Sequence, residues 1–406
     1  MRIAVLFARL GPYHVARLQA LSTSHDVVAV ELSGENINYD WNPIDVEGLQ
    51  HVQLFDTNHR TVPIPQLRDA LHAVLRRYQP DVVAVPGWWD PGALAAIEWC
   101  QTHTTPVVLM SDSTAIDAPR VAWREWPKRQ VVDLCGSALV AGTRHETYAR
   151  RLGMPAERIF TGYDVVDNAH FAAGAEAARS SAQSLHAARN LPHNYFMACC
   201  RFIEKKNLSR LLTAYATYRQ RAERNGGSPW SLVLVGDGPL RGALEKQVQD
   251  LGLAKAVRFP GFCQYEDLPV YYGLARAFVH VSTHEQWGLV VNEAMAAGLP
   301  VLVSERCGCT PDLVVDDRNG YTVDPYASDE IARGLHRLAH EGGNLEQMGH
   351  ESRQIIDHWT PQTFARNMGK AAEAARVASL DGGLSWPRQA LLHGLMWKEA
   401  PLPSWT

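Results

Sequence analysis

The sequence predicts an α/β protein built from two doubly wound domains. Short runs rich in Val, Ile and Leu alternate with longer amphipathic runs along most of the chain. The short runs are apolar throughout, which is typical of parallel strands covered on both faces. A length of 406 residues exceeds one ordinary hydrophobic core, so two such domains fit the chain.

The first half contains the elements of one doubly wound domain. Its predicted strands are 2–8, 27–32, 81–85, 106–110, 138–141 and 158–162, and its predicted helices are 13–21, 66–78, 92–101 and 144–152. The N-terminal apolar core covers only residues 3–8, which is too short for an export signal. We therefore interpret it as the first buried strand.

The alternation stops at residue 164 and resumes near residue 195. The intervening stretch is rich in Ala and Ser without a strong apolar stripe, so residues 166–192 are interpreted as a linker. The second half has predicted strands at 195–202, 231–235, 257–259, 277–281, 300–304 and 321–323, and predicted helices at 208–224, 241–251, 268–274, 289–297, 328–341, 344–358 and 361–379.

These patterns predict an N-terminal domain at 1–165 and a C-terminal domain at 193–375. Residues 376–406 either pack back on the first domain or contact another copy of the chain.

Composition excludes several classes of protein. The charged content of 20% and hydrophobic content of 46% are those of a globular protein, and the net charge of −4 argues against general nucleic-acid binding. No run of about 18 apolar residues predicts a membrane span. None of the seven cysteines forms the two-residue-spaced pairs of zinc or redox sites, so we expect reduced, buried thiols in the cytoplasm.

The central functional stretch is 281–324. Gly288 precedes a predicted helix, with Glu285 in the loop before it and Glu293 about one turn into it. Backbone N–H groups of Gly288, Leu289 and Val290 at a helix N-terminus favour a phosphate. Carboxylates accept paired hydrogen bonds from hydroxyl groups, so the stretch suits a polyol diphosphate such as a nucleotide sugar.

Other polar residues follow strands of the same predicted sheet. Arg201 and Lys206 follow one strand and could bracket a diphosphate, although an ordinary solvated loop explains them as well. Gly236-Asp237-Gly238 follows the next strand and either approaches a ligand or makes a plain turn. Phe262, after Pro260-Gly261, either lines a flat base or belongs to a turn.

Taken together, these motifs resemble those of the family 4 glycosyltransferases, which have the GT-B fold. The resemblance covers nearly the whole second half, including turns at Gly308 and Gly320, and reaches into the first half at 152–155 and 163–168. It implies two Rossmann-like domains that face each other across a cleft.

The resemblance also implies roles for the donor-side residues. Arg201 and Lys206 would hold the diphosphate as the leaving group, Glu285 would bind the donor sugar and Glu293 the ribose. Gly288 and Leu289 would offer backbone N–H groups, and Gly11 would lie against the diphosphate from the first domain, or else serve as a simple turn residue. The catalytic residues implied are Arg201, Lys206 and Glu285.

The same resemblance implies a retaining reaction. The chain contains no Asp-x-Asp motif, so we expect no metal and no cofactor beyond a UDP- or GDP-sugar substrate. The two cations would then carry the electrostatic stabilisation of the leaving group.

The acceptor side has weaker candidates. Family members often place a histidine after the strand equivalent to 106–110, whereas this chain has Asp112 there, which could orient a hydroxyl or cap the next segment. His14 is a second candidate, with a structural role as the alternative. Trp88, beside Trp89, could stack on an acceptor or pack in the core.

Residues 120–129 combine tryptophans with basic side chains. That composition fits contact with the inner face of a membrane, as in relatives that glycosylate lipids. The alternative is a solvated helix edge that packs its tryptophans inward.

We therefore predict a retaining, metal-independent glycosyltransferase that moves a sugar from a UDP- or GDP-sugar to a hydroxyl acceptor (a glycan, a lipid or a small molecule). An epimerase or phosphorylase on the same fold is the first alternative, and it would need a water-activating base or a phosphate pocket. A non-catalytic nucleotide-sugar-binding module is the second, and it would tolerate loss of Arg201 and Lys206.

Overall fold

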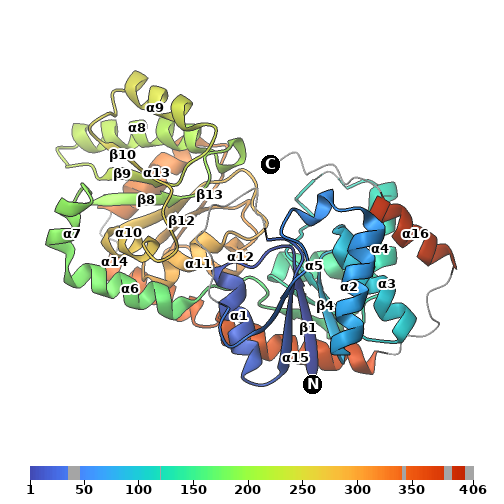
Figure 1. Ribbon diagram of the computed structural model, residues 1–406. Helices are drawn as coiled ribbons and strands as arrows, with labels where there is room; N and C mark the ends of the chain where they lie inside the picture. The colour runs from blue at the N-terminus through green and yellow to red at the C-terminus, as the bar shows by residue number, and fades with distance from the viewer. Residues whose placement is uncertain (35–45, 119, 341–343, 379–385, 398–406) are drawn as a thin grey trace. The chain divides into compact units, whose positions relative to one another are not determined.

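A computed structural model describes residues 1–34, 46–118, 120–340, 344–378 and 386–397. The chain forms two compact units: residues 1–165 together with the chain from 361 onward, and residues 166–360 (Figure 1). Each unit is a parallel sheet covered by helices, which confirms the predicted α/β class of two doubly wound units. The predicted cleft between them stays a prediction. No helix in the described part of the chain is long and apolar enough to cross a membrane.

The sheet of the first unit has the strand order β3-β2-β1-β4-β5-β6-β7 within the described residues, and every pairing in it is parallel. The strands are β1 (Arg2–Phe7), β2 (Asp26–Glu31), β3 (Gln50–Gln53), β4 (Val82–Pro86), β5 (Val107–Ser111), β6 (Ser137–Val140) and β7 (Ile159–Thr161). The order reverses between β1 and β4, which is the switch point at which such sheets bind ligands.

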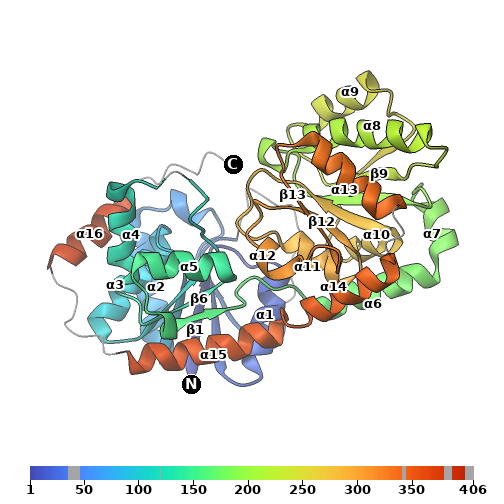
Figure 2. The ribbon, with the colours of Figure 1, turned by 180° about the vertical axis from the view of Figure 1, so that it is seen from behind.

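Helices cover both faces of this sheet. They are α1 (Pro12–Ser22), α2 (Ile64–Tyr78), α3 (Pro91–His103), α4 (Ala122–Val132), α5 (Thr143–Leu152), α15 (Pro361–Val377) and α16 (Trp386–Trp397), with short 3-10 turns η1 (His59–Thr61) and η2 (Ala156–Arg158). Helices α2 to α5 and α16 contribute to one apolar cluster with β1, β4, β5 and β6. Helices α1 and α15 lie side by side along the sheet in both views (Figures 1 and 2).

The sheet of the second unit repeats this plan, with the order β10-β9-β8-β11-β12-β13 and parallel pairing throughout. The strands are β8 (Tyr195–Cys199), β9 (Ser231–Val235), β10 (Val257–Gly261), β11 (Ala277–His280), β12 (Val301–Ser304) and β13 (Gly320–Val323). Its switch point lies between β8 and β11.

The helices of the second unit form two layers. They are α6 (Asn168–Ser180), α7 (Ala182–Ala188), α8 (Leu208–Arg224), α9 (Arg241–Asp250), α10 (Leu268–Leu274), α11 (Leu289–Ala296), α12 (Thr310–Leu313), α13 (Ser328–His340) and α14 (Leu345–Ile356), with the 3-10 turn η3 (Glu204–Lys206). Helices α8, α9 and α13 lie on one face, and α6, α10, α11 and α14 lie on the other (Figure 1).

The stretch 166–192, interpreted as a linker, instead forms α6 and α7 of the second unit. Helix α6 packs on α10 with almost no space between the backbones: a side chain at Gly273 would begin 2.6 Å from the Ala175 carbonyl oxygen, and one at Gly174 would begin 2.5 Å from Pro269. Small residues permit this approach. The composition that indicated a linker is therefore that of a close helix–helix interface.

The chain returns to the first unit at residue 361, before the predicted position of 376. Helix α15 carries Phe364, Met368, Ala371 and Ala372, all fully buried, and Ser137 of β6 donates a hydrogen bond to the Ala371 carbonyl oxygen at 2.6 Å. Helix α15 is thus a core element of the first unit.

Candidate functional site

The predicted donor residues of the second unit lie at its switch point. Arg201 and Lys206 are in the loop after β8, and Glu285 is in the loop after β11, its neighbour in the sheet. The predicted strand 195–202 ends at Cys199, because residues 200–202 leave the sheet to form this loop. Parallel strands point their carboxyl ends to one edge, so the two loops meet there.

Lys206 and Glu285 form an ion pair between the Nζ and Oε2 atoms, and each side chain is 13% exposed. His280, the last residue of β11, places its Nε2 atom 3.4 Å from the same Oε2 atom. Burial alone would raise the pKa of Glu285, but the Lys206 charge and the His280 hydrogen bond outweigh burial and hold that pKa well below its usual range. Glu285 is therefore an ionised acceptor of hydrogen bonds at neutral pH.

The N-terminus of α11 lies beside this carboxylate. Gly288, the N-cap residue, has a φ of 108°, a left-handed conformation that favours glycine. A side chain there would begin 3.5 Å from the Glu285 Cγ atom and 3.6 Å from the Cys309 Sγ atom. The first N–H groups of a helix have no partner inside the helix, so Leu289 and Val290 present donors at this end. The backbone N–H groups of Leu289 and Val290 thus offer hydrogen-bond donors beside the Glu285 carboxylate, which is a hydrogen-bond acceptor.

Two further contacts fix the loop between β11 and α11. The backbone N–H of Gly308 donates to the Glu285 carbonyl oxygen at 2.9 Å, which joins this loop to the one after β12. Trp287 donates its indole N–H to the Oδ1 atom of fully buried Asn292 at 2.9 Å. The position of Glu285 is therefore set by backbone pairing on one side and by a buried indole on the other.

Glu293 lies differently from Glu285. Its side chain is fully buried in α11, and the Tyr272 hydroxyl donates a hydrogen bond to its Oε2 atom at 2.7 Å. A ribose could reach this carboxylate only if the side chains over it moved. The predicted ribose contact of Glu293 stays a prediction.

Close backbone packing explains why positions 236 and 238 of Gly236-Asp237-Gly238 are glycine. A side chain at Gly236 would begin 2.0 Å from the Cys200 carbonyl oxygen, and one at Gly238 would begin 2.8 Å from the backbone of Phe202. The N–H of Phe202 donates to the Asp237 carbonyl oxygen at 2.8 Å. The absence of side chains at these two glycines therefore lets the loop that carries Arg201 pack closely against them. Their predicted role in donor binding would be indirect, through the position of that loop.

Asp237 and Phe262 occupy the outer part of the same sheet edge. The exposed Asp237 carboxylate pairs at 3.0 Å with Arg241, the first residue of α9. Phe262 follows β10 with 41% of its side chain exposed, and Gly261 before it has a φ of 95°. Phe262 is therefore partly exposed, and its predicted contact with a flat base stays a prediction.

Gly11 and His14 form one structural unit in the first unit of the chain. Gly11 is the N-cap of α1, and its N–H donates to the Nδ1 atom of His14 at 2.9 Å. Burial, with the charge of Arg17, lowers the pKa of His14 to about 3. The ring is therefore neutral at pH 7 and carries its proton on Nε2. His14 can donate a hydrogen bond through Nε2, but it is not placed to take a proton there.

The two remaining acceptor candidates, Trp88 and Asp112, differ in how deeply they are buried. Trp88 is only 4% exposed and packs its ring edge-on to Tyr148 with centroids 6.0 Å apart, so the stacking role predicted for it is corrected to core packing. Its neighbour Trp89 is 36% exposed. Asp112 follows β5 and is half-buried, so its predicted contact with a hydroxyl group stays a prediction.

The segment 120–129 forms most of α4, so it is helical, as the alternative interpretation of a helix edge required. Arg120 and Lys128 point inward and donate to the Tyr148 hydroxyl, each at 2.9 Å. Trp123 and Trp126 are 65% and 56% exposed, so the interpretation that these tryptophans pack inward is wrong. Two of the four basic side chains of the segment, Arg120 and Lys128, therefore form contacts inside the first unit. Both indole rings face outward.

Sequence reasoning missed His280 and Tyr272, which contact the two glutamates. The signal for His280 was present, since a polar ring ends an otherwise apolar strand five residues before Glu285. No group of three or more His, Cys, Asp or Glu side chains in the described residues is arranged to hold a metal ion.

Parts of this chain are similar to known proteins. Residues 184–355, which span the sheet with Arg201, Lys206 and Glu285, match the family model of the glycosyl transferases group 1. The second unit is thus similar to the group 1 glycosyltransferases.

Similar proteins include two bacterial sugar transferases. The chain is 24% identical over 249 residues to an α-D-kanosaminyltransferase of Streptomyces kanamyceticus, covering 61% of this chain and 62% of that protein. It is 29% identical over 198 residues to a GDP-mannose-dependent α-(1-6)-phosphatidylinositol monomannoside mannosyltransferase of Mycolicibacterium smegmatis, covering 47% and 48%. The matched stretches span less than two thirds of these relatives.

Several solved structures share the fold over most of this chain. Sucrose-phosphate synthase from Thermosynechococcus elongatus superposes with a TM-score of 0.70 at 20% identity, covering 91% of this chain and 97% of that one. HepE of Anabaena, solved in complex with UDP, gives a TM-score of 0.68 at 16% identity and covers 91% and 98%. These likenesses confirm the predicted GT-B class.

Proposed function

We propose that this protein transfers a sugar from a nucleoside diphosphate sugar to a hydroxyl acceptor. The observation that carries the proposal is the ionised Glu285, held between Lys206 and His280 at the switch point beside the N-terminus of α11. The match of residues 184–355 to the group 1 family model supports the reaction class. The kinship with a GDP-mannose-dependent enzyme and with a UDP-binding fold supports a GDP- or UDP-linked donor.

In this proposal the diphosphate lies on the cationic loop after β8 and on the N–H groups of Leu289 and Val290. Arg201 binds phosphate oxygens through paired hydrogen bonds from its guanidinium group. Lys206 pairs with the phosphate in addition to Glu285. Glu285 accepts hydrogen bonds from donor-sugar hydroxyls. These roles follow from the position of each group at the same sheet edge.

The proposed transfer retains the anomeric configuration. The bond between the sugar C1 and the phosphate oxygen breaks, and the acceptor oxygen bonds to C1 on the same face. The acceptor's proton passes to the departing phosphate oxygen, so the protein need not supply a base. Negative charge grows on the phosphate as the bond breaks, and Arg201 and Lys206 therefore stabilise the transition state more than the ground state.

On the acceptor side, we propose that His14 donates a hydrogen bond through Nε2 and that Asp112 orients a hydroxyl. We also propose that the exposed Trp123 and Trp126 contact a membrane surface, supported by exposed Arg124 and Arg129 on the same helix. Co-sedimentation with anionic vesicles tests this contact. A Trp123→Ala/Trp126→Ala double variant that sediments as the parent does would overturn it.

The transfer itself is tested with the purified full chain and a panel of UDP- and GDP-sugars. Release of nucleoside diphosphate is measured with and without hydroxyl acceptors, in the presence of a chelator. We expect Glu285→Ala and Lys206→Ala to lower the rate by about 100-fold or more, since each removes a charge at the reacting groups. The anomeric proton signal of the product reports retention.

Two variants control for loss of charge alone. Lys246→Ala removes a lysine that is 75% exposed on α9, and Glu176→Gln neutralises a glutamate that is 67% exposed on α6. Both should release product at the parent rate. Unchanged turnover in folded Glu285→Ala protein would contradict the proposed site, and loss of turnover in the chelator would contradict metal independence.

A further inference from the structure

The most exposed tryptophans of this protein gather on two neighbouring helices of the first unit. Among the described residues, the tryptophans that are more than half exposed are Trp123 (65%) and Trp126 (56%) of α4, and Trp386 (80%) and Trp397 (66%) of α16. Helices α4 and α16 lie side by side in both views (Figures 1 and 2). Single exposed apolar side chains are common on a protein surface, but four indoles on adjacent helices are not a random scatter.

Helix α16 is apolar on two opposite faces. Its buried residues Leu392, Leu395 and Met396 belong to the core cluster that also includes residues of α3 and α4. Trp386 and Trp397 are about three turns apart at 3.6 residues per turn, so both lie on one face of the helix. Leu395 is about two and a half turns after Trp386, which places the buried face opposite the indoles. One apolar face of α16 is therefore left open to solvent in the described structure.

Polar contacts fix α16 on the first unit. The His393 Nε2 atom lies 2.7 Å from the Oε1 atom of Glu98 on α3, and Arg388 pairs with Asp133 at the end of α4. Asp133 is about two turns after Trp126, so both residues lie on the same face of α4. Helix α16 therefore extends the exposed indole surface of α4.

The exposed charges on α4 are positive. Arg124 and Arg129 are exposed, and neither pairs with a carboxylate in the part of the chain that the structure describes. The acidic residues are already neutralised, since Glu125 is buried with Lys128 at 2.8 Å and Asp133 pairs with Arg388. Exposed indoles together with unpaired cations are typical of a helix that lies in the interface of an anionic membrane.

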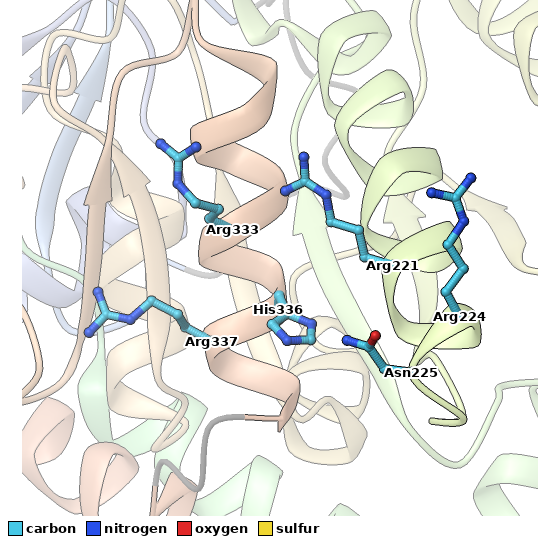
Figure 3. Close-up of a pocket in the computed structure, with 6 residues that line it drawn as sticks. All are labelled: Arg221, Arg224, Asn225, Arg333, His336 and Arg337. Carbon is cyan, nitrogen blue, oxygen red and sulfur yellow. The ribbon is translucent and has the colours of Figure 1, made fainter.

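The arginines around the hollow between α8 and α13 provide a contrast (Figure 3). There Arg221 pairs with Asp329 and Arg337 pairs with Asp317, as ordinary surface charges do. The Arg337 guanidinium group also points away from the hollow in Figure 3. That hollow therefore indicates no ligand, whereas the unpaired arginines of α4 lie beside exposed indoles.

We propose that α4 and α16 together form one surface that binds an anionic lipid membrane. The proposal rests on the membrane contact already proposed for Trp123 and Trp126, and it adds Trp386 and Trp397 to that contact. Indoles suit the boundary between headgroups and acyl chains, because the ring is apolar and its N–H group is polar. Contact through α4 alone would let the unit roll about the helix axis. Contact through a second helix holds the unit in one orientation on the lipid.

The test is co-sedimentation of the full chain with vesicles of phosphatidylcholine and phosphatidylglycerol, compared with vesicles of phosphatidylcholine alone. We expect the chain to bind the mixed vesicles more strongly. Trp386→Ala/Trp397→Ala should lower the bound fraction at least several-fold, as Trp123→Ala/Trp126→Ala should. Both indoles of α16 face solvent, so thermal unfolding of this variant should match that of the parent. The measurement needs no sugar transfer, so its failure would leave the proposed reaction untouched.

The control is Leu251→Ala/Tyr326→Ala, which removes two exposed apolar side chains from the second unit. It should sediment as the parent does. If the α4 variant loses binding and the α16 variant does not, the inference about α16 is wrong while the contact of α4 stands. A parent chain that does not bind the mixed vesicles, or an equal loss in the control, would overturn the whole surface.

Two further measurements separate a membrane from a second copy of this chain. Sedimentation velocity without lipid should give the same mass for the parent and for Trp386→Ala/Trp397→Ala. A parent dimer that these substitutions convert to a monomer would overturn the proposal, because the indoles would then be buried between copies. With mixed vesicles, a photoactivatable phospholipid should label peptides from both α4 and α16. Labelling of α4 alone would remove α16 from the surface.

Discussion

His280 links a buried strand to the proposed reacting group. Its ring is 3% exposed at the end of β11, and its Nε2 atom lies 3.4 Å from the Glu285 carboxylate and 3.3 Å from the Ser282 hydroxyl. Burial lowers the pKa of His280, so the ring is neutral near pH 7. It touches no substrate in the proposed mechanism, and we assign it a positioning role.

We predict that His280→Leu, which keeps most of the buried volume, lowers kcat several-fold with a smaller change in KM. Loss of the His280 hydrogen bond removes one of the contributions that lower the pKa of Glu285. The acid limb of the transfer rate should therefore move to higher pH. Rates measured from pH 4 to pH 8 check this, and an unmoved acid limb would leave His280 with a packing role only.

His14 gives a prediction about stability and pH. Its pKa is about 3 in the folded chain and about 6.5 when exposed, so the unfolded state binds more protons between these values. The contribution of His14 is therefore fully present above pH 6.5 and is lost as pH falls toward 3. One proton changes the free energy of unfolding by up to about 1.4 kcal/mol per pH unit.

We expect His14→Gln to flatten this acid slope, because glutamine can accept from Gly11 but does not titrate in this range. Urea unfolding of the first unit at intervals from pH 7 to pH 4 measures the slope. His186→Gln, at a partly exposed histidine in α7 of the second unit, is the control and should leave it unchanged. Equal slopes for His14→Gln and the parent would contradict the prediction.

At the scale of elements, glycines decide how closely loops and helices approach. Gly236 has a φ of 126°, and a side chain there would begin 2.0 Å from the Cys200 carbonyl oxygen. Strain and overlap each cost on the order of 1–3 kcal/mol, so we predict that Gly236→Ala destabilises the second unit by about 3 kcal/mol. It should also lower activity, because the displaced loop carries Arg201.

Gly242 supplies the matched control for this substitution. It lies in α9, six residues further along, and a side chain there would meet nothing within 4 Å. Gly242→Ala should be neutral or stabilise the unit by up to about 0.5 kcal/mol, because alanine loses less freedom in a helix. Thermal unfolding of both variants is the measurement, and a similar effect for the two would contradict the argument from loop contact.

At the scale of the whole molecule, the chain crosses from the first unit to the second and returns. Helix α15 fills the first unit's core after the second unit is complete, and Gly136 lets it approach so closely that a side chain there would begin 2.8 Å from Ala375. Strand β1 and helix α16, far apart in the sequence, thus contribute to one core. The first unit cannot cover the face of its sheet that lies under α15 until the chain has returned.

We predict that a chain truncated after Thr360 loses the fold of the first unit but keeps that of the second. Hydrogen exchange should show rapid exchange in β5 and β6 and continued protection in β8 and β11. A chain truncated after Ala378 retains α15 and should keep both units protected, with the first less stable because buried Leu392 of α16 is lost. Protected β5 and β6 amides in the shorter chain would contradict the prediction.

The fold class followed from local patterns. Buried parallel strands must be apolar on both faces, so runs such as Val82–Pro86 and Ser231–Val235 were visible without knowledge of their neighbours. Polar residues that follow runs of this kind, among them Arg201, Lys206 and Glu285, were predicted to lie at one edge of the sheet. The reason is that the carboxyl ends of parallel strands lie at the same edge. Short or surface elements such as β3 and α4 lacked such a pattern.

The sequence by itself therefore determined two doubly wound units and the loops that carry the donor-side candidates. Tertiary structure alone decided that Glu285 is ionised and 13% exposed whereas Glu293 is fully buried and hydrogen-bonded to Tyr272, since spacing along a chain does not reveal burial. It also decided that the Ala- and Ser-rich stretch forms two helices of the second unit, one of which packs closely on α10. These outcomes depend on contacts between residues far apart in sequence, and no local pattern encodes them.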